Sequence, residues 1–168
     1  DRIFHLAMTK QFNSALFAGL WQVKTSEVNS IMKSLSDQFA FVNNNRIHSL
    51  IRTSLISHLH QELSNGSASP LASFFSHYSS VCADYFNDQL NQLRKSILSS
   101  EILYSERRYC DALIGYYCSL MWSNPEAVFN SLPGTFLELI HFNVNFITQL
   151  LWHISEFRDV LSKPYTKS

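Results

Sequence analysis

Charged side chains are scarce in this chain of 168 residues: Lys, Arg, Asp and Glu together make up 15%, against about 25% in typical soluble domains. Ser, Asn, Gln, Thr and His must therefore cover much of the surface. The 13 basic residues balance the 13 acidic ones, so the chain lacks the basic excess with which nucleic-acid-binding domains contact many phosphates. We expect no direct binding to nucleic acid.

Glycine, proline and cysteine are also few. The four Pro and two of the four Gly fall at or between the ends of periodic segments, and Gly19 and Gly115 are the exceptions; this distribution is expected of long helices joined by short turns. The three Cys cannot all pair within one chain and lie among apolar neighbours, which favours reduced thiols and an intracellular location, cytoplasmic or nuclear. No apolar run reaches the roughly 18 residues of a membrane span, and no secretory signal pattern opens the chain.

Apolar residues recur at three- and four-residue steps along most of the chain, and this pattern predicts an all-α fold. We expect an irregular, orthogonal bundle of about seven helices, with a short helical-repeat superhelix as the alternative. The predicted segments span residues 3–22, 26–42, 47–63, 70–98, 101–122, 125–132 and 135–162. The length fits a single domain over 1–168. Because the chain opens at Asp1 without Met, we expect it to be a segment of a longer protein.

Three sequence signals predict where helices begin. Ser69 and Asn124 each precede a proline, so that a capping side chain is followed by the residue best suited to the first helical position. Thr135 and Glu138 have the spacing of a capping box. They predict that a last helix begins after a break at Pro133.

The stretch 107–122, RRYCDALIGYYCSLMW, contains two cysteines that could indicate a metal or redox site. Cys110 and Cys118 are eight residues apart, so on one helix their Cα atoms lie about 12 Å apart, beyond the limit of about 7 Å for a disulfide. Both are in phase with Leu113 and Tyr117, and no further Cys or His ligand stands nearby. We interpret them as buried thiols that pack as small apolar groups.

Two other groups of titratable residues resemble sites only in part. His58 and Glu62 would share a helix face, but the pattern lacks the second His of a zinc protease motif. Asp84 and Asp88 are four apart and are better explained as solvated side chains than as an acid–base pair. We therefore predict no catalytic residues, no metal, no cofactor and no enzymatic activity, and keep a helical enzyme using His58, Asp84 or Asp88 as a minor alternative.

Aromatic side chains are abundant: 13 Phe, 7 Tyr and 3 Trp exceed what a core of this size needs, and the centres of interfaces are rich in aromatics and poor in charge. The sequence predicts a non-enzymatic, intracellular scaffold or adaptor domain that dimerises or docks a partner peptide or helix. The alternative is a carrier of lipid or a small apolar ligand in an internal cavity. The expected anchors for a partner are Phe17, Trp21, Phe142, Phe146 and Trp152.

Overall fold

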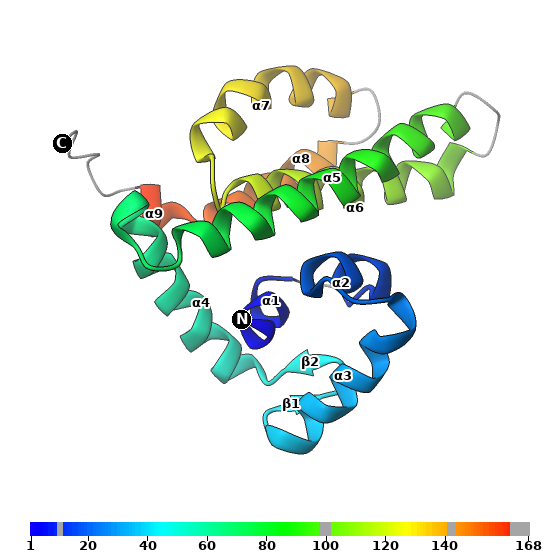
Figure 1. The fold of residues 1–168 in the computed structure, drawn as a ribbon. Coiled ribbons are helices and arrows are strands. Elements are labelled where there is room, and N and C mark those ends of the chain that lie inside the picture. The colour runs from blue at the N-terminus through cyan, green and yellow to red at the C-terminus, as the bar shows by residue number, and fades with distance from the viewer. Residues whose placement is uncertain (10–11, 98–101, 141–143, 162–168) are drawn as a thin grey trace. The chain divides into compact units, whose positions relative to one another are not determined.

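The computed structural model describes residues 1–9, 12–97, 102–140 and 144–161 (Figure 1). Its regular structure is almost entirely α-helical, which confirms the predicted all-α class. The contacts divide the chain into two compact units, Asp1–Phe74 (unit 1) and Phe75–Ser168 (unit 2). The single domain over 1–168 stays a prediction.

The helices in chain order are α1 (Arg2–Met8), α2 (Ser14–Trp21), α3 (Thr25–Gln38), α4 (Ser49–Ser64), α5 (Ala72–Ile97), α6 (Ile102–Leu120), α7 (Pro125–Ile140), α8 (Val144–Ser155) and α9 (Arg158–Leu161). A short hairpin of β1 (Val42–Asn43) and β2 (Arg46–Ile47) and a turn of 3-10 helix, η1 (Gly66–Ala68), complete the described elements. The boundary between the units falls near the start of α5.

The first predicted helix is two helices, α1 and α2, in unit 1. Asn13 explains where α2 begins, because its Oδ1 accepts hydrogen bonds from the N–H groups of Ala15 and Leu16 at 2.9 and 3.1 Å. Such a cap satisfies donors that have no partner inside the helix. α2 ends at Gln22, whose φ of 54° is left-handed.

A β-hairpin replaces the predicted end of the second helix. α3 stops at Gln38, and Val42, which we expected in the helix, pairs with Ile47 across the antiparallel hairpin. The two turn residues, Asn44 and Asn45, have φ of 48° and 60°. Asn tolerates this conformation, and two consecutive positive φ values form the tight turn that matches the twist of a hairpin. The run of asparagines therefore turns the chain instead of merely ending a helix.

In unit 1, α1 packs on α4 and β2, and α2 packs on α3. The core is formed by apolar side chains from each of these elements: Leu6, Ala7, Leu16, Phe17, Leu20, Trp21, Val28, Met32, Val42, Ile47 and Leu59. Ser69 connects the last turn of α4 to the residues just before α5. Its Oγ donates to Glu62 Oε2 at 2.8 Å and accepts from the N–H of Leu71 at 3.1 Å. The predicted start signal at Ser69 therefore acts three residues before the first residue of α5, Ala72.

In unit 2, α5 and α6 form a long hairpin (Figure 1). At its base Phe75 stacks on Trp122 with ring centroids 5.6 Å apart, and Ser123 Oγ donates to Ser79 Oγ at 2.6 Å. Further along, Arg94 Nε donates to the hydroxyl of Tyr109 at 3.3 Å. These contacts fix the register of the two helices over most of their length.

α7 corrects the prediction of a break at Pro133. The helix continues from Pro125 to Ile140 with Pro133 inside it, and Figure 1 shows it as a curved arc. Thr135 is therefore no N-cap: its Oγ1 donates back to the carbonyl of Ser131 at 3.3 Å and also contacts the buried hydroxyl of Tyr117. Tertiary packing of this turn outweighs the local cost of proline, which bends the helix instead of ending it.

Candidate partner-binding face

The sequence of α8 places apolar and polar side chains on different sides of the helix. Leu150 and Ile154, four residues apart, are 0% and 4% exposed and face the core of unit 2. The helix packs on both α6 and α7. This packing fixes which side of α8 remains open to solvent.

The open side is centred on Trp152, whose side chain is 71% exposed. Within α8, the exposed residues at three, four and seven positions from it share its face. We name these residues the Trp152 face: Asn145, Thr148, Gln149, Trp152 and Ser155; Glu156, four positions on and just beyond α8, is exposed at its C-terminal edge. A tryptophan at this exposure leaves a large apolar ring in water, which is costly unless something else covers it.

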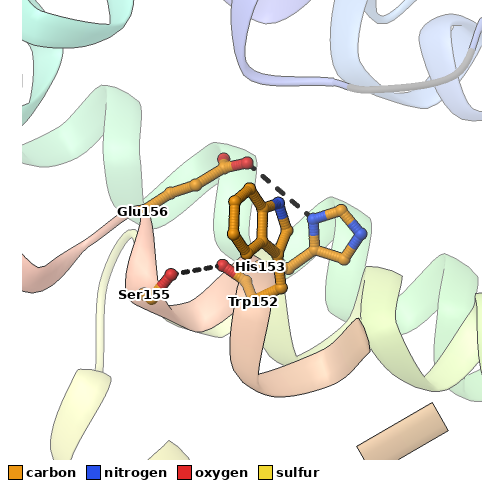
Figure 2. A network of polar contacts seen from close by, with 4 residues as sticks. All are labelled: Trp152, His153, Ser155 and Glu156. Carbon is orange, nitrogen blue, oxygen red and sulfur yellow. Dashed lines mark hydrogen bonds and ion pairs between the residues drawn. The ribbon is translucent and has the colours of Figure 1, made fainter. Parts of the chain in front are cut away.

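Figure 2 shows the C-terminal end of this face. Ser155 Oγ donates to the backbone carbonyl of Trp152 at 2.6 Å, and so satisfies an acceptor in the last turn of the helix. His153 Nδ1 lies 3.8 Å from Glu156 Oε1, three residues further along the chain. Glu156 is the acidic group next to the face, and a protonated His153 would partly balance its charge.

The Trp152 face carries no ionisable side chain. None of the twelve residues of α8 is Lys, Arg, Asp or Glu. Burying this face against a partner therefore does not bury an unpaired charge, whose desolvation would be costly. Polar groups exposed on this face, such as the Thr148 hydroxyl and the Gln149 amide, require hydrogen-bond partners at a dry interface.

Leucines that the helical pattern would bury are partly open. Leu151, which we expected on the buried stripe of the last helix, is 45% exposed and flanks the Trp152 face. Leu50 belongs to the apolar stripe of α4, which we expected to be buried, but it is 73% exposed. The spacing of apolar residues shows which side of a helix is apolar. It does not show how much of that side the neighbouring helices cover, and for this reason both leucines were expected to be buried.

The structure separates the five predicted anchors. Phe17 and Trp21 were expected at the surface, and this is wrong: they are 1% and 8% exposed, and their rings lie 4.9 Å apart in unit 1. Phe146 is half-buried on α8. Phe142 lies outside the described residues. Trp152 is the anchor that keeps its exposed position.

Two contacts that helical spacing does not predict help to bury Phe17 and Trp21. Phe12 stacks on Phe17 with centroids 5.2 Å apart, although Phe12 lies before the α2 cap and outside any helical stripe. On the other side of the pair, the Arg2 guanidinium lies 5.7 Å from the Trp21 ring, within the range of a cation–π contact. Residues from three separate segments thus enclose the pair.

The two cysteines at the centre of the α5–α6 hairpin are buried thiols. Cys82 and Cys110 are each 1% exposed and, like the half-buried Cys118, are not in a disulfide. Burial raises the pKa of Cys82 to about 12. Burial, with Asp111 and Glu106 nearby, likewise raises the pKa of Cys110 to about 12. These thiols are poor nucleophiles at neutral pH, because the thiolate is the reactive form.

The other candidate groups are not brought together. His58 is exposed beside the Phe4 ring, and the Glu62 carboxylate is engaged by Ser69. Asp84 and Asp88 are both exposed on α5. Over the residues that the structure describes, no group of three or more His, Cys, Asp or Glu could hold a metal ion.

The fold and this face define an all-α helical protein with an aromatic, uncharged patch on one helix. No family model, no curated protein and no solved structure matches the chain. Within the described ranges, no helix combines the length and apolarity needed to cross a bilayer. Function therefore has to be argued from the face itself.

Proposed function

We propose that this chain is a protein-interaction module that binds a helix of a partner protein along the Trp152 face. One observation supports this above the others: a tryptophan that is 71% exposed lies on a face of α8 whose residues carry no ionisable side chain. Interface centres are depleted of charge, and tryptophan is over-represented among the residues that carry most of the binding energy.

The size of the face argues for a single partner helix. α8 has 12 residues, so it is about 18 Å long and, at a diameter of about 10 Å, offers roughly 200 Å². A stable interface of standard size buries about 800 Å² on each partner. The Trp152 face alone is too small for a tight homodimer, but it suits a helix laid along it in a weak or transient complex.

The chemistry of the face also limits the partner. A Lys or Glu on the partner that met Thr148 or Gln149 would lose its hydration without gaining an opposite charge. The partner helix should therefore present an apolar stripe for Trp152, flanked by uncharged donors and acceptors for the hydroxyl and amide groups.

Photo-crosslinking in cells tests this proposal directly. A benzophenone side chain placed at Gln149 should form an adduct with one protein, which mass spectrometry then identifies. The same group at Ser54, an exposed residue of α4, is the matched control and should give no such adduct. Trp152→Ala should reduce the yield about tenfold or more, because truncating a hot spot costs about 2 kcal/mol or more.

Leu50→Ala separates a specific face from general stickiness. Leu50 is as exposed as Trp152 but lies in unit 1, so its truncation should leave the adduct at Gln149 unchanged. Absence of any adduct would contradict the proposal. An adduct of twice the protein's own mass would replace the partner helix by a second copy, and an apolar molecule retained in native mass spectrometry would favour the carrier.

A further inference from the structure

The loop between α4 and α5 contains the one Asn-Gly pair of the sequence, Asn65-Gly66. Both residues are exposed. Gly66 has a φ of +56°, and a Cβ placed on it would meet no heavy atom within 4 Å. Side-chain packing therefore does not hold Gly66 in place, and the Asn65 carbonyl is held by one backbone hydrogen bond, from the N–H of Ala68 at 3.2 Å.

We propose that Asn65 is a deamidation site. After losing its proton to solvent, the backbone nitrogen of Gly66 attacks Cγ of Asn65; a new bond forms between these two atoms, the bond from Cγ to the amide nitrogen Nδ2 breaks, and ammonia leaves. One water molecule then opens the resulting five-membered succinimide. Hydrolysis of the bond to Cγ gives aspartate, and hydrolysis of the backbone bond gives isoaspartate, so each conversion consumes one water and releases one ammonia.

Glycine at position 66 makes this reaction fast for a physical reason. It has no side chain to shield its nitrogen, and its backbone rotates with little hindrance. The ψ of Asn65 is −7° in the structure, so the loop must rotate to bring the nitrogen onto Cγ. That rotation meets no packed side chain at Gly66.

The reaction has a structural consequence. The product carries a carboxylate at position 65 in a protein whose formal net charge is zero, and Asn65 N–H donates to the carbonyl of Glu62 at 3.0 Å. The Glu62 carboxylate is the acceptor of the Ser69 hydroxyl. Conversion therefore adds a second carboxylate three residues from Glu62 along the chain, and like charges at this spacing repel mildly.

Three Asn-Ser pairs in the same sequence serve as internal controls. In each, the attacking group would be the backbone nitrogen of serine, which is the next least hindered after that of glycine. Asn13 is held by the two hydrogen bonds of its cap. Asn29 and Asn130 lie inside α3 and α7, where the helix fixes their backbone. All three should react more slowly than Asn65.

Peptide mapping by mass spectrometry after incubation of the purified full-length protein tests the proposal. The peptide that contains Asn65 should convert from the mass of the amide to that of the acid several-fold faster than the three peptides that contain the Asn-Ser pairs. It should do so as two separable isomers, and faster at alkaline than at neutral pH. In Asn65→Gln, whose longer side chain disfavours the ring, the gain should vanish from this peptide.

Two results would overturn the proposal. One is an unchanged Asn65 peptide, or an Asn-Ser peptide that converts first. The other is a sugar on Asn65 in protein taken from its native cells, because Asn65-Gly66-Ser67 also has the form of an N-glycosylation acceptor and a glycan blocks the amide.

Discussion

At the scale of single residues, Cys82 and Cys110 couple stability to pH. The pKa of each thiol rises from 9.0 to about 12 on folding, mainly through burial. Above pH 9 the thiols of the unfolded protein lose protons that the folded protein keeps, so the free energy of unfolding falls as pH rises. The expected slope is up to about 1.4 kcal/mol per pH unit for each thiol between pH 9 and 12.

Urea denaturation at a series of alkaline pH values checks this slope, and Cys82→Ala is the comparison. The variant loses some packing at every pH, but its stability should decline less steeply because one titrating thiol is gone. Burial also raises the pKa of Tyr85, and this contribution is present in both proteins and cancels in their difference. Equal slopes would show that Cys82 ionises similarly in both states.

Single residues also show what a sequence can and cannot say about the candidate face. The helical phase of Cys110 predicted a buried thiol, and Cys110 is buried. The abundance of rings predicted that some would be exposed, but phase could not choose between Trp21 and Trp152. Trp21 is buried in part because Phe12 and Arg2, which lie outside α2, contact Phe17 and Trp21 respectively.

At the scale of elements, glycine makes opposite contributions in α6 and α7. A Cβ on Gly115 would lie 2.4 Å from Cζ of Phe86, so α6 approaches α5 through this residue. Gly134 sits inside α7 with no heavy atom within 4 Å of such a Cβ. Gly115→Ala should destabilise the protein by about 1–3 kcal/mol through overpacking. Gly134→Ala should stabilise it by about 0.5–1 kcal/mol, because alanine restricts the unfolded state.

Chemical denaturation of the two alanine variants measures both effects on one scale. Phe86→Leu in the Gly115→Ala background removes the ring that the new methyl group meets, and should recover part of the loss. If Gly115→Ala were as stable as the parent protein, the close approach of α6 to Phe86 would not be a constraint on the fold.

Much of the element structure could be predicted, since the helices have long apolar stripes and local caps. The cap at Asn124, whose Oδ1 accepts from the N–H of Ala127 at 3.1 Å, begins α7 as expected. The errors fall where local and tertiary preferences conflict. Pro133 remains helical because Thr135 is held by Tyr117 from another helix, and Val42 leaves α3 because two asparagines adopt positive φ.

At the scale of the whole molecule, many of the aromatic rings that the structure describes pack against one another inside the two units. In unit 2, Trp122 packs between Phe75, Tyr78 and Phe157. In unit 1, the rings of Phe4 and His5 lie 5.9 and 4.8 Å from that of Phe74. Aromatic clusters of this kind supply much of the apolar burial of a core with few charges. Trp152 stands apart from them, which is why it rather than composition alone supports the binding proposal.

The two units share helix α5, and we expect this helix to make the protein unfold as one domain. Phe74 contributes its ring to unit 1, where it stacks on His5, and the next residue, Phe75, contributes its ring to the core of unit 2. Unwinding the first turns of α5 therefore removes a ring from each core at once. In variants that keep only Trp21 or only Trp122, the fluorescence transition of the remaining tryptophan should have the same midpoint as the loss of helix measured by circular dichroism on the same variant.

Phe74→Ala makes this test specific, because Phe74 and its ring partners Phe4 and His5 all lie in unit 1. Truncating a half-buried Phe should cost about 2 kcal/mol, which lowers a midpoint by about 4–8 °C in a protein of this size. If the protein is one cooperative domain, the Trp122 signal of unit 2 must move by the same amount as the Trp21 signal. A shift confined to Trp21 would mean that the units unfold independently, and the single-domain prediction over 1–168 would be wrong.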